Sequence, residues 1–443
     1  MPVLPPPTVA RRERAIRITV AASVAAKAFS VACTLAQVPL ALHYLGTETY
    51  GFWVTLVGVV VMLNFVDFGL GVGMQHAMAR GFGVDDMDSV RRVFWSGVAL
   101  LGVLGLGFAA VGVPLALLYP WNDALHLADP ELRASCGRAL ALAVALVAVA
   151  LPFNASTRLV GALQRGWIHA GWIAAGSALS LGLVAAAARG RWGFLWFLGA
   201  SLLVPAAQGL GLTLHLLFVL RWRPWPCGFS ASAELGAMLR SSASFAFPQF
   251  GQALVQATPS IAISLASGSA SVTAFNLLTR LFSPFLQSQL ILLTPVWPAY
   301  TEAHARGDHA WVRRALGRTL AATAALAACV GVAGWQSAAL LRLWVGSATP
   351  APSRALVGAT AAWSVLQMAV QPLVYYLAGI GRLRRLAWAA TPGMLVTTAA
   401  LLVGARSAGA VGVIAAGSAA LALSLLLPLA LETLRSVKSG GAS

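Results

Sequence analysis

Residues 21–42 read AASVAAKAFSVACTLAQVPLAL, an apolar run that is interrupted by polar residues at steps of three or four. The polar positions are Ser23, Lys27, Ser30, Thr34 and Gln37. In an α-helix this spacing places them on one face. A polar face within a bilayer costs free energy unless it lines water or packs against protein. The stretch therefore predicts a membrane helix with one polar face.

Three further apolar segments have the same pattern of polar residues. Their polar positions are, segment by segment, Asn64, Asp67, Gly71 and Gln75, then Gln249, Gln252, Gln256 and Ser260, then Thr273, Asn276, Arg280, Ser283 and Gln287. The four segments occupy matching places in the two halves of the chain. They therefore predict one shared central cavity, which is typical of a transporter.

The composition indicates an integral membrane protein. Of the 443 residues, 59% are hydrophobic and 10% are charged, whereas soluble domains have roughly 25% charged residues. The mean hydropathy is +0.79. Because a spanning helix needs about 20 apolar residues, we expect an all-α fold of about twelve transmembrane helices. Their centres lie near Phe29, Leu63, Leu106, Val147, Leu179, Pro205, Ala257, Phe285, Ala328, Gln367, Leu395 and Ala420.

The net charge of +17 reports orientation in the membrane. With a cytoplasmic N-terminus, most of the basic residues, Arg158 among them, fall in segments predicted to be cytoplasmic, as the positive-inside rule requires. We therefore expect both termini in the cytoplasm and no nucleic-acid partner.

The two halves of the chain repeat one design. At a shift of 222 residues Asp86 falls on Asp308, and Val90-Arg91-Arg92 falls on Val312-Arg313-Arg314. Six spans in each half give both halves the same orientation, which predicts a parallel repeat with the substrate site at the interface of the halves. We expect two six-helix bundles around a central cavity, residues 1–225 and 226–443.

Motifs of catalysis and nucleotide binding are absent from the sequence. It contains no GxxxxGK[ST], HExxH or GxSxG pattern, and its cysteines are scattered without metal-ligand spacing. Residues 69–73, GLGVG, follow no strand and predict close helix packing or a local break. We therefore expect no enzyme activity, no cofactor and no metal site. Coupling to a proton or sodium gradient stays open.

Two cations lie deep within predicted spans. Lys27 is roughly 9 residues, or ~13 Å, past the start of its helix, near the middle of a hydrocarbon layer that is about 30 Å thick. Arg280 enters from the opposite face to a similar depth. An unpaired cation there costs at least about 2.5–3.5 kcal/mol. Either the two neutralise Asp67 or helix-end carbonyls, or they capture an anion. Asp67 could be a counter-ion, a proton or sodium carrier, or a gate.

Several stretches of the chain resemble a known family. Residues 44–53 read YLGTETYGFW and residues 64–71 read NFVDFGLG. Residues 293–303, LTPVWPAYTEA, and 306–308, RGD, follow in the second half. Together they resemble the polysaccharide transporters and O-antigen flippases of the multidrug/oligosaccharidyl-lipid/polysaccharide superfamily.

The resemblance implies a flippase that works by alternating access. It would move an undecaprenyl-diphosphate-linked oligosaccharide from the cytoplasmic to the periplasmic leaflet of the bacterial inner membrane, for surface polysaccharide or lipopolysaccharide biosynthesis. Helices one, two, seven and eight would line the cavity. The partners would be the lipid-linked oligosaccharide diphosphate, membrane lipids and other polysaccharide-assembly membrane proteins.

We expect the substrate to contact the polar stripes, with Asp67 as the coupling residue or counter-ion. The expected substrate-binding residues are Lys27, Arg280, Ser30, Thr34, Gln37, Asn64, Gln252, Gln256 and Asn276. One alternative is a multidrug/cation antiporter of the same fold, although it would need surplus acids in the cavity. The other is a membrane-embedded glycan transferase or polymerase, although such an enzyme would need a sizeable loop of acids or arginines, and Asp123, Asp129 and Glu131 of the third loop are too few.

Overall fold

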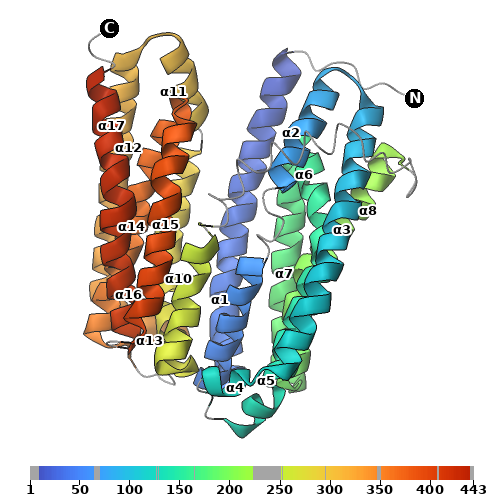
Figure 1. Ribbon diagram of the computed structural model, residues 1–443, viewed down its shortest axis with the longest axis vertical. Coiled ribbons are helices and arrows are strands. Elements are labelled where there is room, and N and C mark those ends of the chain that lie inside the picture. The colour runs from blue at the N-terminus through green and yellow to red at the C-terminus, as the bar shows by residue number, and fades with distance from the viewer. Residues whose placement is uncertain are drawn as a thin grey trace. The chain divides into compact units, whose positions relative to one another are not determined.

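A computed structural model describes residues 9–63, 70–125, 127, 129–163, 165–222, 251, 253–294, 296–346, 351–406 and 409–439. Every regular element in these ranges is helical (Figure 1). Within these described ranges, eight helices are long and apolar enough to cross a membrane, and their lengths run from 25 to 40 residues. The expectation of an all-helical membrane protein is thereby confirmed.

All twelve predicted span centres fall on helical residues. The predicted total of twelve spans stays a prediction. The element α1 (Val9–Leu63) consists of two helices joined at Gly46, where the backbone is not helical. The helices Ala253–Ser267 and Ala390–Gly404 are apolar but shorter than the eight. The helix α10 (Ser269–Leu293) is long enough but carries one of the polar stripes.

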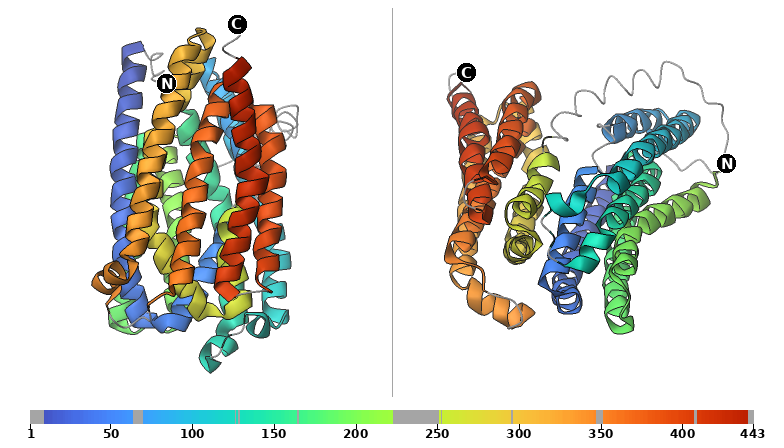
Figure 2. Two further views of the ribbon diagram at one scale, coloured as in Figure 1. Left: turned by 90° about the vertical axis from the view of Figure 1, so that its left-hand side faces the viewer. Right: turned by 60° about the horizontal axis from the view of Figure 1, so that its bottom comes forward.

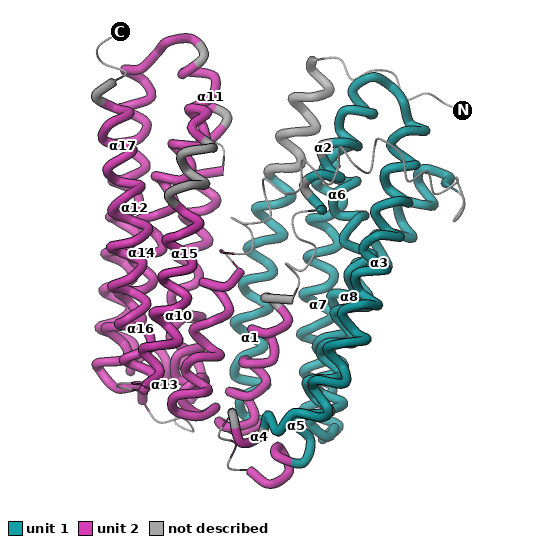
Figure 3. Tube along the Cα trace, viewed as in Figure 1, with its two compact units in different colours: residues 1–44, 63–121, 134–249 teal, residues 45–62, 122–133, 250–443 magenta. Residues whose placement is uncertain are grey.

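The chain divides into two compact units (Figure 3). Unit 1 comprises residues 1–44, 63–121 and 134–249, and unit 2 comprises residues 45–62, 122–133 and 250–443. The predicted bundles, 1–225 and 226–443, differ from these units at 45–62 and 122–133. The predicted boundary itself lies outside the described residues, so the domain division stays a prediction.

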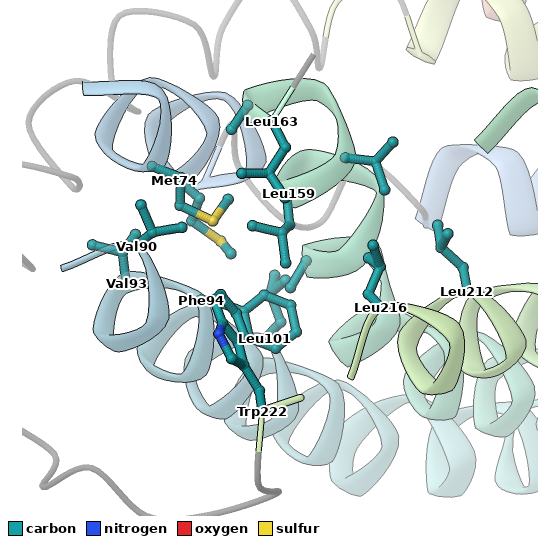
Figure 4. Close-up of a cluster of buried hydrophobic side chains, with 14 of the residues drawn as sticks. Met74, Val90, Val93, Phe94, Leu101, Leu159, Leu163, Leu212, Leu216 and Trp222 are labelled. Atoms are coloured by element: carbon teal, nitrogen blue, oxygen red, sulfur yellow. The ribbon is translucent and has the colours of Figure 1, made fainter. Parts of the chain in front are cut away.

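Unit 1 is a helical bundle with an apolar core. Besides the first part of α1, its elements are α2 (Leu70–Gly83), α3 (Met87–Leu118), most of α5 (Pro130–Ala150), the 3-10 turn η1 (Leu151–Phe153), α6 (Asn154–Ala162), α7 (Gly166–Gly190) and α8 (Phe194–Leu220). Met74 of α2, Phe94 of α3 and Leu159 of α6 are fully buried in the core shown in Figure 4. The division between the units falls within the short helix α4 (Trp121–Ala124), with Trp121 in unit 1 and the remainder in unit 2.

Unit 2 is a second helical bundle. Figure 2 shows its long helices side by side, and α12 packs on α14 while α15 packs on α16. Its elements after α10 are α11 (Val296–Ala305), α12 (His309–Trp335), α13 (Ser337–Val345), α14 (Arg354–Gly379), α15 (Leu383–Gly404), α16 (Gly409–Ala420), the π-helical turn η2 (Leu421–Leu426) and α17 (Leu427–Ser439).

The backbone repeats at the shift of 222 residues. Gly46 (φ 74°, ψ 174°) breaks α1, and Gly268 (φ 75°, ψ 172°) has nearly the same conformation before α10. Asp86 caps α3 by accepting a hydrogen bond from the Ser89 N–H, as Asp308 caps α12 by accepting one from the Trp311 N–H. These matched turns support the internal repeat predicted from the sequence.

Both glycines occupy a backbone region that only glycine adopts at low cost. We expect Gly46→Ala and Gly268→Ala each to destabilise the protein by about 1–3 kcal/mol, measured as a lower midpoint of thermal unfolding in detergent. Gly182→Ala in α7 and Gly331→Ala in α12 are matched controls, since an added Cβ meets no atom within 4 Å there. If the controls lose as much stability as the two test variants, backbone conformation is not the cause.

Candidate functional site

The polar stripe of α10 packs against residues 47–55 within unit 2. The Tyr50 hydroxyl donates a hydrogen bond to Asn276 Oδ1 at 2.8 Å, and Thr273 Oγ1 donates one to the Thr47 carbonyl at 2.6 Å. Tyr50 is 1% exposed and Asn276 is 8% exposed. Two of the polar positions that the sequence assigns to a cavity are therefore occupied by a helix–helix contact.

The contact depends on the glycine of the YGFW stretch. A Cβ added to Gly51 would overlap the Ser269 carbonyl oxygen and lie 2.8 Å from Thr273 Oγ1. At the shift of 222 residues Gly51 corresponds to Thr273, and Thr47 corresponds to Ser269. The two contacts are therefore equivalent: the Thr47 carbonyl faces Thr273, and the Ser269 carbonyl faces Gly51. Thr273 donates a hydrogen bond from its hydroxyl, whereas Gly51 has no side chain.

Arg280 lies one turn beyond Asn276 on the same stripe. It is half-buried and close enough to Tyr50 to act on it electrostatically. Its carbonyl loses the usual helical donor because Pro284 has no N–H, and the Ser283 hydroxyl bonds it instead at 2.9 Å. No described residue forms an ion pair or hydrogen bond with the guanidinium group, which leaves its donors available to a ligand.

In unit 1 the stripe of α1 faces α7 at several positions. Ser177 Oγ donates to Ser30 Oγ at 2.8 Å, and Gln37 Nε2 donates to Ser180 Oγ at 3.1 Å. Thr34 Oγ1 bonds the Ser30 carbonyl of its own helix at 2.8 Å. All three stripe residues are half-buried. Their polar atoms thus find partners within the unit, and their contact with substrate stays a prediction.

Lys27 differs from these neighbours because it is exposed. Within the described ranges no residue pairs with its ammonium group. Gln256, on the helix Ala253–Ser267, is exposed too. Asn64, Asp67 and Gln252 lie outside the described residues, so the pairing of Asp67 with either cation stays a prediction.

Arg158 is a half-buried cation whose packing inside unit 1 the sequence did not predict. It was counted among the cytoplasmic basic residues, yet it lies in α6 against α2. A Cβ added to Gly71 would overlap its Nε and lie 2.8 Å from Cζ and Nη2, so the missing side chain makes room for the guanidinium group. One turn along α2, the Gln75 amide occupies the space beside Gly161. The expected role of the GLGVG stretch in close packing is confirmed at Gly71.

The position of Arg158 could have been anticipated from the spacing of its neighbours. Gly71 and Gln75 are four residues apart and face one partner helix. His169 of α7 is also close to Arg158, and its Nδ1 is buried without a hydrogen-bond partner in the described part of the chain. The second stripe therefore contributes to the packing of unit 1.

The basic groups of the spans have few acidic counterparts. Lys27, Arg158 and Arg280 lie inside helices. Among the acids of the described spans, Glu48 lies just after the break of α1 at Gly46, and Glu432 lies near the end of the last span. Glu48 accepts the Asp129 N–H at 3.1 Å, and Glu432 pairs with Arg382 at 2.9 Å. No group of three or more potential metal ligands occurs among the described residues. The arrangement suits an anionic ligand that also accepts hydrogen bonds.

The fold is that of transporters of the MOP superfamily. No model of a protein family matches the sequence, and no curated protein matches it. An inward-facing multidrug resistance MATE family transporter of this superfamily is 15% identical with a TM-score of 0.77, and the match covers 94% of this chain and 96% of the other. An outward-facing one is 17% identical with a TM-score of 0.65 and coverages of 97% and 96%.

A third similar structure comes from Pyrococcus furiosus Vc1. It is a MOP superfamily transporter described as having a binding pocket of reverse polarity that suggests a different function. It is 16% identical with a TM-score of 0.66, and the match covers 97% of each chain. At these identities the likeness shows the fold alone.

A double-mutant cycle tests the bond between Tyr50 and Asn276. Tyr50→Phe and Asn276→Leu should be coupled by about 1 kcal/mol, because either change alone removes the same buried hydrogen bond. The measurement is the shift in unfolding free energy in detergent. Tyr50→Phe with Thr323→Val is the control cycle and should be additive. Additivity in both cycles would contradict the bond.

The packing of Arg158 is tested at Gly71. Gly71→Ala should destabilise unit 1 by up to about 1 kcal/mol, since the new methyl group displaces the guanidinium group, which ends a flexible side chain and can move aside. Gly83→Ala near the end of the same helix should be nearly neutral, because an added Cβ there meets no atom within 4 Å. Equal unfolding midpoints for the two variants would rule out the predicted crowding.

Proposed function

We propose that this chain is a flippase that moves an undecaprenyl-diphosphate-linked oligosaccharide from the cytoplasmic to the periplasmic leaflet by alternating access. The observation that carries the proposal is the surplus of base inside the spans. Lys27 and Arg280 have no counter-ion among the described residues, and the acids of the described spans lie near span ends or, as Glu48 does, beside the break of α1 at Gly46.

A diphosphate is the kind of group that this charge distribution favours. Its negative charge loses hydration when it enters the membrane, and a cation that donates hydrogen bonds replaces part of that hydration. Arg280 can bind two phosphate oxygens at once, whereas Lys27 acts as a point charge. Moving one negative charge outward across an inside-negative membrane is favourable by about 2.3 kcal/mol per 100 mV.

The energy source follows from the same charge. The sequence contains no ATP-binding motif, and the membrane potential already favours export of an anion. Export by this chain therefore needs no ATP hydrolysis of its own. The glycan would find hydrogen-bonding partners in amides such as Gln256, whose side chain is exposed.

The alternative is a cation antiporter of the same fold. Multidrug MATE transporters have a similar fold, and a cationic drug would require acids in the cavity. The reverse pocket polarity described for the Pyrococcus furiosus transporter supports the view that proteins of this fold can bind substrates of different charge. Here the basic surplus favours an anion. We place the protein in the bacterial inner membrane with both termini in the cytoplasm.

Reconstituted vesicles separate the two functions. Wild-type protein should transport a radiolabelled short-chain diphosphate-linked N-acetylglucosamine and should not transport tetraphenylphosphonium. Lys27→Gln and Arg280→Gln should each weaken transport by roughly 10- to 150-fold, the equivalent of about 1.5–3 kcal/mol for a charged hydrogen bond. Arg280→Lys should retain part of the activity.

Arg354→Gln is the matched control, because Arg354 is an exposed cation at the start of α14. Its transport rate should equal that of the wild type. Transport of the cation without the diphosphate would instead support the antiporter. Unchanged diphosphate transport in both test variants would remove the assigned role of the two cations.

A further inference from the structure

A pocket of about 180 Å³ lies in unit 2 between the end of α10 and the first half of α12. One side of it is apolar, with Leu292, Leu293 and Leu326, and the other is polar. Leu292 is 53% exposed, so the pocket opens onto the surface of the unit. None of its residues belongs to the polar stripes proposed to contact the transported substrate.

The polar side of the pocket is fixed by hydrogen bonds. Gln289 is 2% exposed and donates to Thr323 Oγ1 at 2.9 Å and to the Met368 carbonyl at 2.7 Å. Thr319 Oγ1 lies 3.3 Å from the Tyr300 hydroxyl and bonds the Leu316 carbonyl at 2.9 Å. The pocket is therefore built from side chains that hydrogen bonds to α10, α11, α12 and α14 hold in place.

Arg318 lines the pocket, and its side chain is exposed. No acidic residue occurs in α12, and in the described part of the chain no ion pair or hydrogen bond involves the side chain of Arg318 or of Arg314, which lies one turn earlier on the same face. Arg306 nearby is already paired with Glu302 at 2.6 Å. Two neighbouring cations thus have no partner among the residues that the structure describes.

The depth of Arg318 places it at the membrane boundary. The helix α12 has 27 residues and is roughly 40 Å long, whereas the hydrocarbon layer is about 30 Å thick. If Trp335 marks the outer boundary, as expected for an interfacial tryptophan, the inner boundary lies near Ala315. On the predicted cytoplasmic side, the backbone of Arg318 then lies just within the hydrocarbon layer. Its long side chain can extend outward to the lipid phosphates.

We propose that this pocket binds an anionic phospholipid of the cytoplasmic leaflet. The phosphate accepts hydrogen bonds from Arg318, with Arg314 adding charge and the Thr319 hydroxyl a further polar contact. Part of an acyl chain fills the space between Leu292 and Leu326. Such a lipid would hold α10 against α12 and would be a resident of the fold. The inference does not depend on which substrate the protein transports.

The test uses delipidated full-length protein in a neutral detergent. Phosphatidylglycerol should raise the midpoint of thermal unfolding well above the effect of phosphatidylcholine, and native mass spectrometry should show it retained. Arg318→Gln should raise at least tenfold the phosphatidylglycerol concentration that gives half of the maximal rise in the unfolding midpoint. Arg318→Lys should raise this concentration less. Ala322→Leu should weaken it as well, because Ala322 lines the pocket and the larger side chain fills it.

Two control variants test whether the loss of any exposed arginine, or the enlargement of any residue of α12, changes the response to phosphatidylglycerol. Arg342→Gln changes an exposed arginine of α13, and Ala325→Leu enlarges an exposed residue of α12 that does not line the pocket. Both should keep the wild-type response. Equal stabilisation by both lipids, or a wild-type response in Arg318→Gln and Ala322→Leu, would overturn the proposal. Stabilisation by inorganic phosphate alone to the same extent would overturn the lipid as the ligand.

Discussion

A polar group in the hydrocarbon of a bilayer needs a partner, and this requirement organises both units. Water cannot supply the partner there, so a hydroxyl or amide is stabilised when it bonds its own backbone, a neighbouring helix or a ligand. Ser30 bonds Ser177 across α1 and α7, Tyr50 bonds Asn276, and Gln289 bonds Thr323. These bonds join particular helices to each other, since apolar contact alone discriminates little between neighbours in lipid.

Glycines set the distances at which these bonds can form. Gly51 lets the first turn of α10 approach residues 47–55, and Gly71 makes room for the guanidinium group of Arg158. Gly46 and Gly268 supply the same rare backbone conformation at corresponding places in the two halves. The repeat therefore preserves backbone geometry at positions where the side chains have diverged. Thr273 donates to a carbonyl, whereas its counterpart Gly51 has no side chain at all.

Cations for which the described part of the chain offers no counter-ion link the fold to its proposed function. Arg280 and Lys27 lie within predicted spans, whereas Arg314 and Arg318 lie near the predicted cytoplasmic boundary. The first pair suits a diphosphate in transit, and the second pair suits a resident lipid phosphate. In the proposed function, the charge of the transported group is set by a few ionisable side chains within the predicted spans and not by the fold.

The sequence by itself determined the membrane class, the positions of the helices and the repeat, because apolar length and the spacing of loop residues are local properties. It also determined that polar residues share helix faces. Only the tertiary structure decided which helix each face meets. Ser30 and Gln37 turn toward α7, and Arg158, counted as a cytoplasmic charge, lies against Gly71. Helical spacing fixes the direction of a side chain relative to its own axis, whereas its partner depends on how helices far apart in the chain pack together.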